Sequence, residues 1–238
     1  MHPEEYPSRI AIRKVIAEGL LLYRQRASTL FILALLAVGT GQACLLFAAA
    51  FVRPQQFPLR ALIGAAMMLT PLAAWLTLAE TFAVTEERTR LQQVLLKPYG
   101  KCWRYIANAT ILSLLLAAIQ VVPIFGYLFY AWFWLRLGLY VVILCVEPLD
   151  HHWLQPLSRS WKMMHGHVRT FFVAAIPPFL GLIPGLIFQH LAFNQVSLEI
   201  GHPAFVLASA VALAIAMPWI VTTQVAMYRA IRSEEQTA

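Results

Sequence analysis

Residues 204–228 read AFVLASAVALAIAMPWIVTTQVAMY, twenty-five positions without a charged side chain. A helix needs about 20 apolar residues to cross a bilayer, so this stretch predicts a membrane-spanning helix. Ala208, Ala212 and Ala216 recur in it at four-residue steps. Small residues at that spacing predict a face against which a neighbouring helix packs closely.

Five more apolar stretches bring the expected spans to six, at 29–52, 61–84, 105–122, 127–147, 169–190 and 204–228. The whole chain of 238 residues is 60% apolar and 12% charged, whereas a soluble domain is about 45–50% apolar and about 25% charged. This composition excludes a soluble enzyme, a disordered protein and a disulfide scaffold. It predicts an all-α fold, with residues 1–238 forming a single polytopic membrane domain of six transmembrane helices.

The basic residues are distributed unevenly over the connections between these spans. Fifteen of the eighteen Lys and Arg residues fall in or beside the segments 1–28, 85–104, 148–169 and 229–238. Only Arg53 and Arg60 fall in the opposite connections. Basic loops stay in the cytoplasm, so both termini are expected there. Residues 1–28 are too long and polar to begin a signal peptide, and we expect 29–52 to be an uncleaved first span.

Three segments have the pattern of amphipathic helices at the cytoplasmic surface, at about 8–26, 86–97 and 155–165. Each combines apolar residues at helical spacing with basic residues elsewhere on the helix, which is typical of interfacial helices. The alternative is that each segment extends a spanning helix. In the third, Pro156 suits the first turn and Gly166 the C-terminal cap. A surface segment, a basic turn and two spans then recur as a pseudo-repeat over about 8–84, 85–147 and 153–228.

The most specific pattern is residues 139–172, LYVVILCVEPLDHHWLQPLSRSWKMMHGHVRTFF. An apolar span ends in an acidic residue, and P-L-x-R-S-W-K-x-x-x-G follows. The pattern resembles the bacterial YciC-type inner-membrane proteins and the membrane domain fused to some glycerophosphodiester phosphodiesterases. The resemblance implies a six-helix domain in a bacterial inner membrane, in families that mostly have no established activity. The phosphodiesterase barrel is absent from this sequence, so its catalysis is not implied.

Two ionisable residues lie inside expected spans, Glu80 in the second and Arg136 in the fourth. Such groups are costly in a membrane and tend to face protein or water. Their depths differ by about 10 Å at 1.5 Å per residue, a gap that an arginine side chain can partly cover. We therefore expect a Glu80–Arg136 pair. The alternative is that Arg136 contacts polar backbone or a lipid phosphate while Glu80 reaches interfacial water.

The fifth expected span contains several helix-disturbing residues, namely Pro177, Pro178, Gly181, Pro184 and Gly185. Prolines remove backbone donors and kink helices. Broken helices build substrate sites in some transporters, whereas the Gly-x-x-x-Gly spacing permits close helix packing. Kinked packing and a substrate site are both open from the sequence.

Acidic and histidine side chains gather after the fourth span, at Glu147, Asp150, His151, His152, His165 and His167. They lack the spacing of a known metal motif, so we predict no metal and no cofactor. The plainer expectation is that Glu147 or Asp150 holds Arg159 or Lys162.

Catalytic motifs are missing from the sequence: it has no G-x-S-x-G, P-loop, Rossmann glycine pattern or H-E-x-x-H. The sequence therefore favours a non-enzymatic membrane protein that organises the envelope or its lipids. Its partners would be anionic phospholipids, contacted through Arg159, Trp161 and Lys162, or another membrane protein, and not nucleic acid. The alternatives are a small transporter with a path near Arg136 and the fifth span, and an enzyme acting on lipids.

Overall fold

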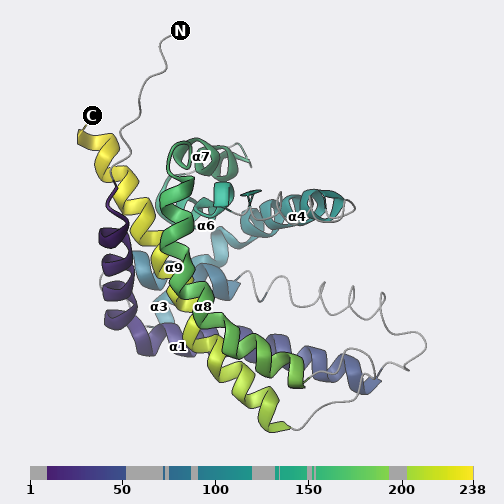
Figure 1. Cartoon of the computed structure of the whole chain (residues 1–238). Helices are drawn as coiled ribbons and strands as arrows, with labels where there is room; N and C mark the ends of the chain where they lie inside the picture. Colours follow the sequence, from purple (N-terminus) through teal and green to yellow (C-terminus); the bar gives the residue numbers. More distant parts are fainter. Residues whose placement is uncertain are drawn as a thin grey trace.

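The computed structural model describes residues 10–51, 72, 75–86, 91–119, 132–133, 135–148, 152, 154–192 and 203–237. These described residues are helices and turns, and no strand occurs among them. The all-α class expected from the composition is therefore confirmed. Figure 1 shows long helices on one side of the molecule and shorter ones on the other.

The long helices are α1 (Ile12–Phe51), α8 (Val168–Ala192) and α9 (Pro203–Thr237). The shorter ones are α3 (Leu91–Leu96), the 3-10 turn η2 (Lys97–Gly100), α4 (Cys102–Ile119), α6 (Tyr140–Val146) and α7 (Gln155–Met163), and residues 75–85 are also helical.

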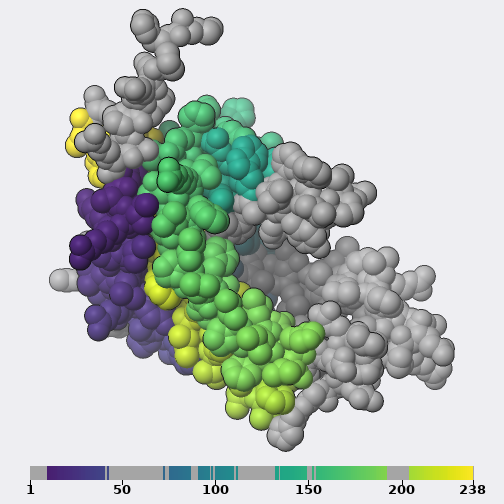
Figure 2. Space-filling view, in the orientation of Figure 1, coloured from purple at the N-terminus to yellow at the C-terminus, as the bar shows by residue number. Residues whose placement is uncertain are grey.

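Helix α9 is central, and its most extensive contacts are with α1 and α8. In Figure 2 it shows mainly along the seam between these two helices and at its ends. The helices α1 and α9 run antiparallel, because successive residues of α1 meet earlier residues of α9. Glu18 lies 3.7 Å from Arg229, whereas the Gln42 amide donates to Ser209 Oγ at 2.9 Å.

Helix α1 bends sharply between two parts (Figure 1). Near the middle of α9, the hydroxyl of Tyr23 donates to the carbonyl of Ile215 at 3.0 Å. Pro218 lies inside α9 three residues further on, where its missing N–H interrupts the helical hydrogen-bond ladder. A side chain of α1 thus binds the backbone of α9 close to that proline.

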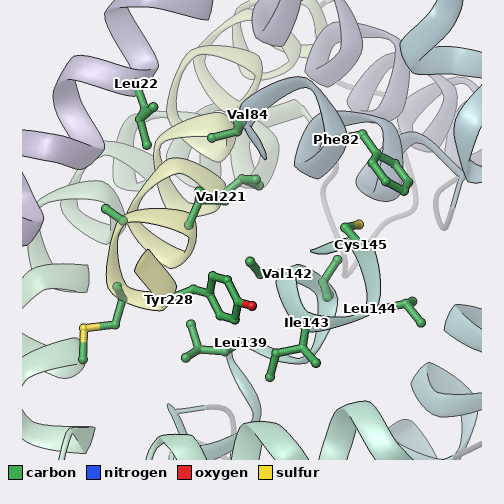
Figure 3. Close-up of a cluster of buried hydrophobic side chains, with 14 of the residues drawn as sticks. Leu22, Phe82, Val84, Leu139, Val142, Ile143, Leu144, Cys145, Val221 and Tyr228 are labelled. Carbon is green, nitrogen blue, oxygen red and sulfur yellow. The ribbon is translucent and has the colours of Figure 1, made fainter. Parts of the chain in front are cut away.

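A second part of the core joins α9 to the middle of the chain. In Figure 3, Tyr228 of α9 lies beside Leu139 and the residues of α6, whereas Leu22 of α1 lies apart from them, toward Val221. Leu139 and Val142 are completely buried. Burial of such side chains stabilises a fold by about 1.5–3 kcal/mol each, so this cluster fixes α6 against α9.

Three stretches of helix are long and apolar enough to cross a membrane: Ile12–Thr40, Val168–Leu191 and Ala204–Thr237. They overlap the first, fifth and sixth expected spans. Much of the second span lies outside the described residues, and α4 covers most of the third with 18 residues. In the described part of the fourth span, a turn at residues 138–139 precedes α6, and the apolar stretch Leu135–Val146 falls short of a spanning length.

The three segments expected to form surface helices differ in how far the structure agrees with the expectation. From Ile12 onward, segment 8–26 is the first part of α1 and continues directly into the first span. Segment 86–97 contains only the short helix α3 and part of η2 in its described portion. Segment 155–165 matches α7, with Pro156 in the first turn as expected. Its C-terminal cap is Met164 rather than Gly166, and Gly166 adopts a φ of 85° in the turn that leads to α8.

Candidate functional site

The strongest polar cluster of the described chain surrounds α7, where the motif residues Arg159, Ser160 and Trp161 each contact another element. Arg159 reaches two carboxylates: its Nη2 lies 3.0 Å from Glu235 Oε2 in α9, and its Nε lies 3.7 Å from Glu147 Oε2 at the end of α6. The expectation that Glu147 holds Arg159 is confirmed.

Two residues of α9 complete this network. The Tyr228 hydroxyl donates to Glu147 Oε1 at 3.1 Å, and Arg232 Nη1 donates to Glu235 Oε2 at 3.2 Å. Glu235 therefore accepts hydrogen bonds from two arginines, whereas Glu147 accepts one from Tyr228 and forms an ion pair with Arg159. The network ties α7 to both α6 and α9, and it leaves neither carboxylate without a cationic partner.

Arg136 also attaches α7 to the rest of the protein. Its guanidinium lies 5.4 Å from the ring centre of Trp132 and 5.2 Å from that of Trp161, within cation–π distance of both. Its Nη1 donates to the Trp161 carbonyl at 3.5 Å and approaches His165 Nδ1 at 3.4 Å. In return, the Ser160 hydroxyl donates to the carbonyl of Arg136 at 3.1 Å.

The two tryptophan rings lie edge to face, with their centres 4.9 Å apart. Cation–π contacts contribute about 0.5–2 kcal/mol each, which makes this group an anchor for α7.

The expected Glu80–Arg136 pair is not formed. Glu80 lies in the helical residues 75–85 and is 6% exposed, and no ion pair joins these two described residues. Trp132, one helical turn before Arg136, and Trp161 of α7 hold the guanidinium instead. The spacing of Trp132 and Arg136 is visible in the sequence, whereas the contact with Trp161 depends on how α7 folds back.

Of the three expected lipid contacts, two bind within the protein and one does not. Arg159 is committed to Glu147 and Glu235, and Trp161 packs on the Arg136 guanidinium. Both side chains therefore bind α7 to the protein. Lys162 is exposed on α7, and it is the member of this set that remains open to a headgroup.

The proline- and glycine-rich part of the fifth span is a packing surface against α9. Helix α8 continues through Pro177, Pro178 and Pro184. A Cβ built on Gly185 would lie 2.6 Å from Leu213 Cδ2, whereas one on Gly181 would lie 3.6 Å from its nearest neighbour, a carbon of α9. The absence of a side chain at Gly185 lets the helices approach, which favours the packing interpretation over a substrate path.

Sequence reasoning missed two cations that bind helix ends. Arg26 Nη2 donates to the carbonyl of Glu86 at 2.9 Å, and Lys101 Nζ donates to the carbonyl of Cys145 at 2.8 Å. Unpaired carbonyls at a helix C-terminus favour such donors. Burial lowers the pKa of the Lys101 ammonium. Both cations belong to the basic connections of the sequence, but the positive charge of those connections was explained there by membrane topology alone.

Among the described residues, no group of three or more His, Cys, Asp or Glu side chains is placed to hold a metal ion. Asp150 and His151 lie outside that part of the chain. The cluster around α7 consists of ion pairs, hydrogen bonds and cation–π contacts, and most of these join α7 to another part of the chain. Comparison of the chain with protein-family models, with curated proteins and with solved structures finds no match.

Proposed function

We propose that this chain is a multi-pass, non-enzymatic protein of a bacterial inner membrane that organises anionic phospholipids, or a membrane-protein partner, at its cytoplasmic face. Both termini would lie on that side. The resemblance of residues 139–172 to YciC-type proteins supports the location, and so does the concentration of basic residues in four segments.

One observation carries the proposal, namely the division of the outer surface into an apolar and a basic zone. Large apolar side chains are exposed along α8 and α9, including Phe172 at 52%, Leu180 at 59% and Leu207 at 66%. Such a surface is unfavourable in water and is accounted for by contact with lipid chains.

The basic zone lies at the other end of the long helices, where the first part of α1 and α7 lie beside the C-terminal part of α9 (Figure 1). Several cations there are exposed and make no ion pair within the described part of the chain: Arg13, Lys14, Arg24, Lys162 and Arg169. An anionic leaflet attracts such groups by about 1 kcal/mol per cation. Anionic headgroups are therefore the partner that fits this zone best.

The non-enzymatic part of the proposal rests on what the ionisable side chains do. Arg159, Glu147 and Glu235 neutralise one another between helices. Arg136 is held between two tryptophan rings. Groups used in this way stabilise the fold and are not poised for proton transfer to a substrate.

The test is native mass spectrometry of the protein in mild detergent, titrated with phosphatidylglycerol or with phosphatidylcholine of the same chains. We expect preferential retention of phosphatidylglycerol, and we expect that preference to weaken as salt rises. Equal retention of the two lipids would contradict the lipid part of the proposal. Conversion of either lipid during incubation would contradict the non-enzymatic part.

A further inference from the structure

We infer that the outward face of the first part of α1 is a phospholipid headgroup site, in which Arg13, Lys14 and Arg24 surround Leu20 and Leu21. This inference rests on the proposed function and names the surface that carries it. This face of α1 takes the place of α7 as the main lipid contact, because Arg159 and Trp161 of α7 bind within the protein.

The orientation of this segment is fixed by its inner face. Val15 is completely buried and Leu22 is 8% exposed. A Cβ on Gly19 would lie 3.3 Å from the Cα of Thr223, so the backbones of α1 and α9 approach closely there. The Glu18–Arg229 ion pair at 3.7 Å lies along the same contact. Rotation of the segment would break all of these contacts.

The outward face then follows from helical geometry. Arg13, Leu20 and Arg24 recur at intervals of seven and four residues, which places them on one side of the helix. Lys14 and Leu21 lie on the adjoining strip, seven residues apart. All five are exposed, with Leu20 at 40% and Leu21 at 54%. The structure thus holds two leucines and three cations together on its surface.

This combination matches the boundary between headgroups and acyl chains. Leucines at that depth bury apolar surface, while long basic side chains extend from the same helix to the phosphates. The nearest acidic side chain of the segment, Glu18, is paired with Arg229 and does not neutralise this face. Three cations that make no ion pair among the described residues favour an anionic lipid over a zwitterionic one.

The inference is tested with the full-length protein carrying Arg13→Gln, Lys14→Gln and Arg24→Gln together. Phosphatidylglycerol retention is measured by native mass spectrometry against that of phosphatidylcholine. We expect the preference for phosphatidylglycerol to fall at least about tenfold, given the attraction of each cation to an anionic surface. The matched control is Lys162→Gln, which removes one exposed cation from α7 and should retain most of the preference.

Thermal stability of the triple variant is measured in parallel, and we expect it to be unchanged because these side chains make no ion pair in the described chain. A second variant, Arg13→Lys with Arg24→Lys, keeps the charge and should keep the preference. If the wild-type protein prefers phosphatidylglycerol and the triple variant does so equally, the inference is wrong and the proposed function stands. If the wild-type protein has no preference, both are wrong. Loss of the preference in Lys162→Gln would also overturn the inference.

Discussion

The contact between α8 and α9 at Gly185 gives the sharpest prediction from this structure. In Gly185→Ala, the new Cβ would lie 2.6 Å from Leu213 Cδ2, 2.7 Å from its Cγ and 3.1 Å from its backbone nitrogen. Carbon atoms normally meet at about 3.5–4.0 Å, so Leu213 must move by about 1 Å. Its main chain is also crowded, and the side chain is 6% exposed, which leaves it little room.

The size of the effect follows from two opposing terms. Overpacking a tightly packed site costs about 1–3 kcal/mol, whereas alanine gains about 0.5–1 kcal/mol over glycine in a helix. We expect Gly185→Ala to lower the free energy of unfolding by about 1–2 kcal/mol. The assay is reversible unfolding of the protein in mixed micelles, followed by far-UV circular dichroism.

Gly181→Ala is the matched control, because it lies one turn earlier on the same helix. Its Cβ would lie 3.6 Å from Ala216 Cβ and 3.8 Å from the Trp219 ring, which are ordinary contacts, so stability should stay the same or rise by up to about 1 kcal/mol. Adding Leu213→Ala to Gly185→Ala should cost less than the sum of the single changes, by about 1 kcal/mol or more. Equal effects of the two alanine substitutions, or strict additivity with Leu213→Ala, would refute the packing argument.

Two further predictions concern the cluster around α7. Arg159→Gln removes two ion pairs, in which the side chains of Arg159 and Glu235 are 34% and 36% exposed and that of Glu147 is 16% exposed. After allowance for solvent screening, it should lower the free energy of unfolding by about 0.5–1 kcal/mol, more than Lys162→Gln. A melting-temperature difference between the two variants that persists unchanged at high salt would argue against an electrostatic origin. Burial lowers the pKa of His167, so the unfolded chain binds more protons than the folded one just below the ordinary value of about 6.5. The free energy of unfolding should therefore fall as the pH drops through that value. Thermal unfolding from pH 7.5 to 5.5 measures this dependence, and His167→Gln should make the melting temperature depend less on pH. An equal pH dependence in both proteins would exclude this histidine as the cause.

Some features of the fold follow directly from local sequence. The apolar stretches around 29–52, 169–190 and 204–228 are long enough to form spanning helices whatever packs beside them. The start of α7 is equally local, because Pro156 suits a first helical turn and little else in a helix. The sequence predicted either close helix packing or a substrate site around Gly185. Small residues at four-residue spacing favour close packing between helices.

Other features depend on contacts that no local pattern contains. An apolar face in residues 8–26 was expected to meet the membrane, but an amphipathic pattern does not distinguish a lipid surface from a neighbouring helix. In the structure, Val15 and Gly19 of that face pack on α9. The same ambiguity affected Arg136, because a guanidinium is held equally well by a carboxylate or by aromatic rings. Only the return of α7 over the fourth segment brings Trp161 within reach.

Cations of the basic connections have a structural role in the described helices. Two of their cations reach backbone carbonyls at the C-terminal end of a helix, Arg26 that of Glu86 and Lys101 that of Cys145. Arg159 instead reaches a side-chain carboxylate, that of Glu235 near the end of α9. The end of a helix carries unpaired carbonyls and partial negative charge, and any long cation serves there. Cations of the basic connections therefore join helices of the described chain to one another, in addition to adding to its positive charge.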